Sequence, residues 1–111
     1  MTEITIHRND NGEPRGLTVH GHSGADKKGN DIVCASISTI FEVLIAAVSG
    51  LPETAVDYSS EPDKPLRHLV IDQNRLRNKE WLTVSGVLKA VCVVARRLAK
   101  NYPEHCRVTE S

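Results

Sequence analysis

The longest apolar repeat in this 111-residue chain lies between Asp31 and Val48. Its apolar residues recur at intervals of three and four, which is the spacing of one face of an α-helix. The repeat consists of Val33, Ile37, Ile40, Phe41, Leu44, Ile45 and Val48, widened by Ile32, Ala35 and Val43. We predict a largely buried helix of about five turns that opens at Asp31. Gly50 and Pro52 favour an end with a glycine in the left-handed conformation.

A second helix and five strands are predicted from the rest of the chain. Asn78 is a candidate cap for the second helix, whose apolar residues run from Trp81 to Leu98, and Tyr102-Pro103 closes it. Alternating apolar residues around the turn 9–12 predict an N-terminal hairpin. Residues 55–58 and 66–71 form two further candidate strands, and residues 105–109 form a fifth.

The order strand, strand, helix, strand, strand, helix, strand predicts an α+β fold. We expect a mostly antiparallel sheet (ββαββαβ) with the two helices packed on one face, in a single domain spanning residues 1–111. A sheet covered on one side leaves its other face open. A homodimer that covers this open face is therefore expected.

Composition excludes several functional classes. Acidic and basic residues balance at 14 each and form no basic stripe, so direct nucleic-acid binding is not expected. The N-terminus lacks the pattern of a secretory signal, and no apolar run approaches membrane-spanning length. A cytoplasmic location follows as the expectation. The three cysteines, Cys34, Cys92 and Cys106, suggest neither a disulfide framework nor a zinc ribbon.

Cys34 is the strongest candidate for chemistry. The predicted helix places it in the first turn, three residues after Asp31. Unpaired N–H groups and the helix dipole favour a thiolate at that position, and the same N–H groups could hold an oxyanion. By contrast, Cys92 lies on the apolar stripe of the second helix, and Cys106 has no such surroundings. Both are interpreted as structural.

A cysteine nucleophile needs a base, and two histidines precede Cys34. His22 lies in the polar, glycine-containing segment 21–30, interpreted as a mobile loop, and is preferred to His20 on the preceding strand. Asp31 has two possible roles, capping the helix and orienting His22. One alternative remains open, in which His20, His22 and Cys34 bind a metal ion.

The residues around this pair resemble a known family. Gly21-His22-Ser23-Gly24, followed by Gly29-Asn30-Asp31-Ile32-Val33-Cys34-Ala35 and by Ser38 four residues after the cysteine, resembles the signature of the Prp family, the bacterial ribosomal-processing cysteine proteases. The order of elements and the Tyr-Pro after the last helix look similar too. Ser23 departs from the alanine that is frequent in the family, and Lys27-Lys28 adds charge.

The resemblance implies a homodimeric cysteine endopeptidase that removes a short N-terminal extension from a large-subunit ribosomal protein and so supports ribosome assembly. It implies His22 as general base and acid and Cys34 as nucleophile, with Asp31 and Ser38 in support. Ser23, Gly24 and Gly29 would belong to a loop, residues 23–30, that moves on substrate binding. No metal ion or other cofactor is implied.

A second hypothesis is a ribosome-associated binding module without enzyme activity. It rests on the small size of the chain and on residues 56–111, which carry ten basic and seven acidic side chains. Such a module would bind ribosomes in a salt-dependent way that ignores replacement of Cys34.

Overall fold

The computed structural model describes residues 1–21, 28–61 and 66–111, with the backbone alone at residues 28–31 and 61. The elements, in chain order, are β1 (Thr2–Arg8), β2 (Pro14–His20), α1 (Lys28–Val48), β3 (Val56–Glu61), β4 (Leu66–Ile71), α2 (Asn78–Asn101) and β5 (Cys106–Glu110). Two short 3-10 helices, Glu53–Ala55 and Gln73–Arg75, precede β3 and α2. The order of strands and helices is the predicted one.

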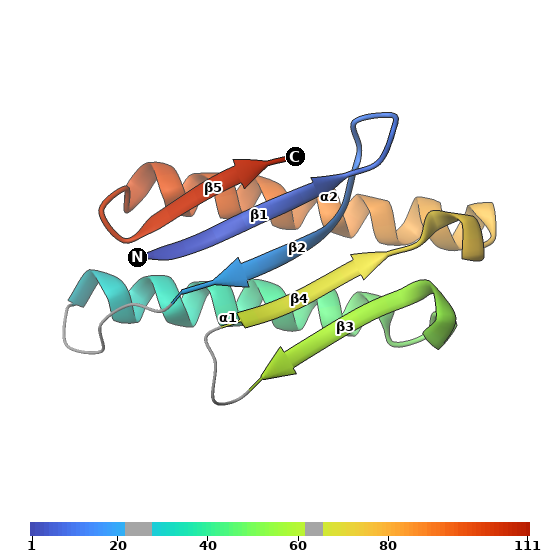
Figure 1. The fold of residues 1–111 in the computed structure, drawn as a ribbon, viewed down its shortest axis with the longest axis horizontal. Helices are drawn as coiled ribbons and strands as arrows, with labels where there is room; N and C mark the ends of the chain where they lie inside the picture. Colours follow the sequence, from blue (N-terminus) through green and yellow to red (C-terminus); the bar gives the residue numbers. More distant parts are fainter. Residues whose placement is uncertain (22–27, 62–65) are drawn as a thin grey trace.

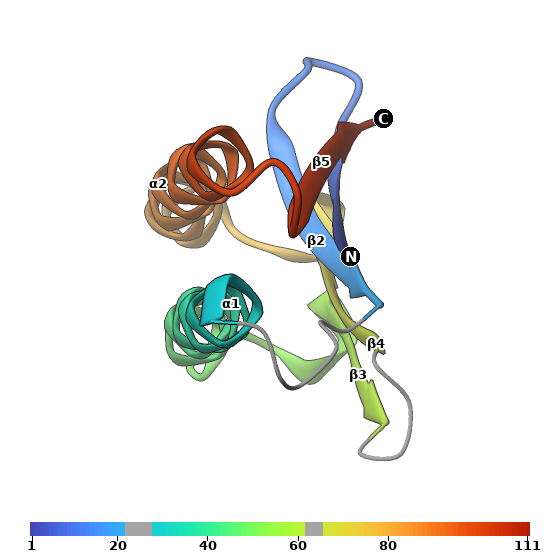
Figure 2. The same cartoon turned by 90° about the vertical axis from the view of Figure 1, so that its left-hand side faces the viewer.

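The five strands form one sheet in the spatial order β3-β4-β2-β1-β5. Neighbouring strands are antiparallel except for β1 and β5, which run parallel. Both helices lie on the same face of this sheet, as Figure 1 and Figure 2 show. The predicted α+β class, with a mostly antiparallel sheet and two helices on one face, is confirmed.

The core lies between the sheet and the helices because side chains alternate along the strands. Ile4 and Ile6 of β1 stand opposite Val19 and Leu17 of β2, and all four point into the core. Phe41 of α1 is fully buried against the same layer. The apolar side chains that alternate along the strands pack in one layer with those that recur every three or four residues along the helices.

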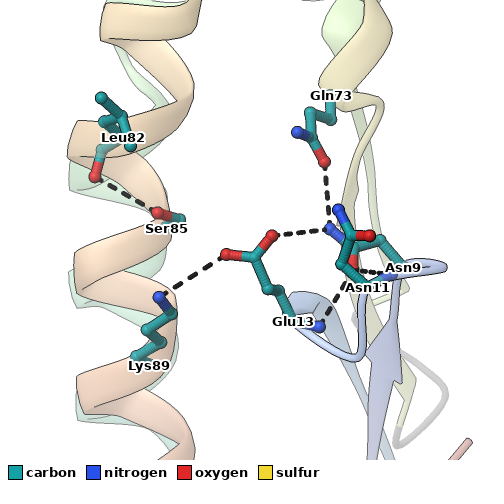
Figure 3. A network of polar contacts seen from close by, with 7 residues as sticks. All are labelled: Asn9, Asn11, Glu13, Gln73, Leu82, Ser85 and Lys89. Atoms are coloured by element: carbon teal, nitrogen blue, oxygen red, sulfur yellow. Dashed lines mark hydrogen bonds and ion pairs between the residues drawn. The ribbon is translucent and has the colours of Figure 1, made fainter.

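Polar contacts hold the β1–β2 hairpin to the 3-10 helix that precedes α2 and to the middle of α2 (Figure 3). The side-chain oxygen of Asn9 accepts hydrogen bonds from the backbone N–H groups of Asn11 and Glu13, at 2.9 Å each. Its amide nitrogen donates to Gln73 at 3.0 Å, and Lys89 of α2 pairs with the Glu13 carboxylate at 3.6 Å. These contacts fix the end of the sheet away from the segment that follows β2.

The open face of the sheet carries a chain of polar side chains. Nε2 of His7 and Nδ1 of His68 each lie 2.7 Å from the hydroxyl oxygen of Thr18, and Nε2 of His68 lies 3.4 Å from Asp57. Burial, the charge of His68 and the charge of Arg15 lower the pKa of His7. Because polar side chains satisfy one another here, the open face does not itself require a covering partner.

The ends of the helices differ from the predictions at two points. Arg77, not Asn78, is the cap residue of α2, and its backbone N–H donates to the Glu80 carboxylate at 2.9 Å. Gly50 does not adopt the left-handed conformation, which among the described glycines occurs at Gly12 and Gly21. Instead, α1 ends in a tight turn in which the Leu51 N–H donates to the Val48 carbonyl. That turn closes the helix without a positive φ.

Candidate active site

Two of the three thiols are core groups. Cys92 on α2 is fully buried, and Cys106 at the start of β5 is 2% exposed. Burial raises the pKa of Cys92 to about 11 and raises that of Cys106 as well. Both thiols are therefore protonated at neutral pH, and their interpretation as structural residues is confirmed. Cys34 differs from both because it is only half-buried.

Cys34 does not lie where the sequence placed it on its helix. α1 begins at Lys28, so Cys34 is its seventh residue, in the second turn. Asp31 is a residue of the helix and does not cap it. Because Gly29 and Asn30 are poor helix formers in a segment with no apolar period, no local pattern predicts this additional turn.

The longer helix changes the electrostatic account of the thiol. The N–H groups that lack helical partners belong to the first four residues of α1, and the effect of the helix dipole falls off within the first turn. The N–H of Cys34 lies inside the ladder of helical hydrogen bonds. The predicted first-turn position, on which the predicted activation by the helix start and the predicted oxyanion site were based, is therefore wrong.

Gly21 fixes the direction in which the chain leaves β2. Its φ of 85° lies in the region that favours glycine, and a Cβ added there would stand 2.5 Å from the carbonyl oxygen of Met1. A side chain is therefore excluded by both conformation and space. In the sequence, Gly21 stood out only as part of the motif around His22, and its conformational role was not predicted. A glycine directly before a candidate base is a signal that could have indicated this role.

The other predicted site residues are distributed as follows. Gly29 is the second residue of α1 and so lies outside the predicted loop, while Ser38 is exposed on α1 one turn after Cys34. His22, Ser23 and Gly24 lie outside the described residues. The competing base, His20, is exposed at the end of β2, opposite Glu3 of β1 and Leu66 of β4.

In the described part of the chain, no cluster of potential ligands supports the metal alternative. Residues 1–21, 28–61 and 66–111 contain no group of three or more histidine, cysteine, aspartate or glutamate side chains that could hold an ion. The alternative depends on His22, which is outside these ranges. Within the same ranges, neither helix is long and apolar enough to cross a membrane.

The structure is thus a two-layer α+β domain with a half-buried thiol on its first helix. The family model for the cysteine protease Prp matches residues 1–107, which is nearly the whole chain. The chain therefore belongs to the Prp family of cysteine proteases. A comparison with the curated proteins found no significant match.

Solved structures with the same fold extend this result. The essential ribosomal processing protease Prp from S. aureus, in complex with a covalently linked product peptide, is 23% identical with a TM-score of 0.79. The same protease in complex with a substrate peptide is 21% identical with a TM-score of 0.81. Both comparisons cover 100% of each chain. SMU.848 from Streptococcus mutans is 27% identical with a TM-score of 0.78, over 99% of this chain and 93% of that one.

Proposed function

We propose that this protein is a cysteine endopeptidase that removes a short N-terminal extension from a large-subunit ribosomal protein. The observation that carries the proposal is that, in a chain of the Prp family, Cys34 is half-buried while the other two thiols are core groups. The S. aureus protease of the same fold, described as ribosomal processing and bound to substrate and product peptides, supports the choice of substrate.

In this proposal Cys34 is the nucleophile and His22 the general base. His22 takes the thiol proton, and the Cys34 sulfur attacks the carbonyl carbon of the scissile peptide bond. His22 then returns that proton to the leaving amine, and the extension remains on Cys34 as a thioester. Water, activated by His22, hydrolyses the thioester and regenerates the thiol. The four steps need no metal ion or organic cofactor.

The position of Cys34 in the second turn makes the proposed mechanism depend on the general base rather than on the helix dipole. Because Cys34 lies in the second turn of α1, beyond the first turn where the helix dipole acts, we assign deprotonation of the thiol to the imidazole of His22. Gly21 directs the chain into this residue. We assign Asp31, one helical turn before Cys34, to orienting His22, and Ser38, one turn after it, to the edge of the site.

We also propose that the 111-residue chain acts as one domain in a cytoplasmic homodimer. Five of its seven exposed large apolar side chains lie on the two helices, namely Ile32 and Val43 of α1 and Leu82, Val93 and Val94 of α2. A second copy would cover them, while the polar open face stays in water. We expect Val43→Lys to yield a monomer in light scattering and Ser59→Lys, at an exposed site on β3, to leave the dimer intact.

The function is tested with the extended ribosomal protein as substrate. We expect Cys34→Ala to abolish cleavage, and His22→Ala to lower kcat/KM by about 10²-fold or more, with both variants folded. His20→Ala is the matched control for the base, and Cys92→Ala for the thiol. Cleavage by Cys34→Ala would disprove the nucleophile, and a loss at His20→Ala equal to that at His22→Ala would disprove the choice of base.

A further inference from the structure

An apolar pocket lies between the end of α1 and the edge of the sheet. Its volume is about 300 Å³, and its apolar lining comes from Ile45 and Val48 of α1, Val56 and Tyr58 of β3, and Leu69 of β4. Ser49 and Glu53 contribute its polar atoms. Such a space suits one or two large apolar side chains rather than a charged group, because an unpaired charge is costly to desolvate there.

This pocket lies on the face of α1 that bears Cys34. Counting from Cys34, Ser38, Phe41, Ile45 and Val48 follow at intervals of 4, 7, 11 and 14 residues, which keeps them on one stripe of the helix. At 1.5 Å per residue, Ile45 and Val48 lie roughly 16–21 Å along the axis from Cys34. An extended peptide covers that distance in about five or six residues.

The strand beside this stripe can hold an extended chain. β3 pairs with β4 and is an edge strand of the sheet in the described structure. Its second row of backbone N–H and C=O groups is available to another strand, and alternate side chains of an added strand point toward the helix layer. Tyr58, 45% exposed, stands on β3 at the wall of the pocket.

Arg67 borders the path between Cys34 and the pocket. Its guanidinium lies 4.5 Å above the ring of Phe41, and its Nη2 donates to Glu42 at 3.3 Å. Its Nε is buried and has no acceptor among the described residues, which leaves one donor beside the stripe.

We propose that this pocket binds an apolar side chain of the extension, five or six residues before the scissile bond. The inference rests on the proposed function and deepens it by naming a remote specificity site. The occupant belongs to the extension because an enzyme that distinguishes precursor from mature protein must recognise the part that it removes. Once hydrolysis frees the extension, the part that fills the pocket is no longer joined to the ribosomal protein.

Two peptides test the inference, one with the full extension and one truncated to three residues before the scissile bond. We expect truncation to lower kcat/KM by about tenfold to hundredfold, the usual range for loss of an apolar contact. Replacing the residues five and six before the bond by Asp in the long peptide should cause the same loss. Asp substitutions at the corresponding positions after the bond should have little effect.

A variant that fills the pocket supplies the second measurement. Ser49 is exposed at the rim and its hydroxyl donates to the Ala46 carbonyl, so Ser49→Trp can close the pocket without entering the core. We expect it to cut the long peptide as slowly as the wild type cuts the short one, and to cut the short peptide normally. Thr83→Trp is the matched control, because Thr83 is exposed on α2 and its hydroxyl likewise donates to a backbone carbonyl, that of Lys79.

The outcomes separate this inference from the proposed function. If both peptides are cut at equal rates and Ser49→Trp is silent, the remote site is disproved while the protease stands. If neither peptide nor the extended ribosomal protein is cut by folded wild-type protein, the proposed function itself fails. Equal slowing of both peptides by Ser49→Trp would also overturn the inference, because a pocket-specific effect must spare the short peptide.

Discussion

The two helices share one face of the sheet but differ in what their side chains do. α2 alternates a buried stripe, which includes the fully buried Cys92, with an outer surface carrying Lys79, Lys89, Arg96 and Arg97. After Asp31, α1 carries one charged residue, Glu42, and its cysteine is half-buried. α2 therefore has the pattern of a supporting surface helix, whereas α1 combines core packing with a stripe that leads from Cys34 to the apolar pocket.

The way the chain enters each helix differs as well. α2 starts with a hydrogen-bonded box between Arg77 and Glu80, which stabilises its first turn locally. α1 is preceded in the chain by Gly21, whose positive φ and close approach to the backbone of Met1, just before β1, leave no room for a side chain. The predicted base, His22, therefore directly follows a position that does not accept a side chain.

The sharpest test of the comparison is the reactivity of the two helical thiols. We expect iodoacetamide to modify Cys34 at least a thousandfold faster than Cys92 in the folded protein at pH 8. With its pKa near 11, Cys92 has about one thiolate in a thousand at that pH, and its burial restricts access further. Peptide mass spectrometry after timed labelling measures both rates in one sample.

Two further labelling experiments serve as controls. In denaturant the two thiols should react at similar rates, because unfolding removes the burial that distinguishes them. Near neutral pH, His22→Ala should slow the labelling of Cys34 and leave that of Cys92 unchanged. Comparable rates for Cys34 and Cys92 in the folded protein would remove the chemical distinction between the helices.

The second test concerns the entry to α1. Gly21→Ala should reduce the free energy of unfolding by about 1–3 kcal/mol through its positive φ alone, and the contact with Met1 should add to this. Because it displaces the chain next to His22, it should also lower kcat of the folded enzyme. Chemical denaturation and steady-state kinetics measure the two effects.

Gly12 provides the matched control for this change. Its φ of 78° is similar, but a Cβ added there would meet nothing within 4 Å, so Gly12→Ala carries the conformational cost without the clash. We expect it to destabilise less and to leave kcat unchanged. Equal effects of the two substitutions would show that the contact between Gly21 and Met1 has no special role.

The elements were predictable from the sequence because their patterns are local. The repeat 31–48 and the apolar residues of α2 specify helices by spacing, and alternation specifies strands, so the α+β class followed from periodicity. What the sequence could not give depends on contacts between distant residues. The parallel pairing of β1 with β5, the clash behind Gly21 and the hydrogen-bonded His7–Thr18–His68 chain all join residues far apart along the chain.

For the candidate site, the sequence proposed the residues but not the position of Cys34 along its helix. Cys34 was found by its position near a helix start, yet α1 begins three residues earlier than predicted. The additional turn consists of Lys28, Gly29 and Asn30, whose types favour a loop. A local pattern proposed Cys34 as the nucleophile, but the strength of the helix dipole at this residue depends on an exact boundary that no pattern in this segment marks.

The third test compares the two cysteines as structural residues. Cys92→Ala should lower the free energy of unfolding by about 1–2 kcal/mol, because it removes a fully buried group from the core, and it should keep cleavage activity. Cys34→Ala should change stability by less than about 0.5 kcal/mol. Paired denaturation curves and activity assays would contradict the comparison if Cys34→Ala were the more destabilising.

The smallest effect is expected at the start of α2. The backbone N–H of Arg77, then its side chain, lower the pKa of Glu80 below its ordinary value of 4.5. A carboxyl whose pKa is lowered in the folded state stabilises the fold above that ordinary value and loses this effect as the pH falls through the lowered one. Glu80→Gln should therefore reduce Tm slightly at pH 7 and progressively less as the pH falls below about 4. Glu104→Gln is the matched control, and a Tm difference at Glu80 that does not shrink in acid would show that the charge of this carboxylate contributes nothing to the helix start.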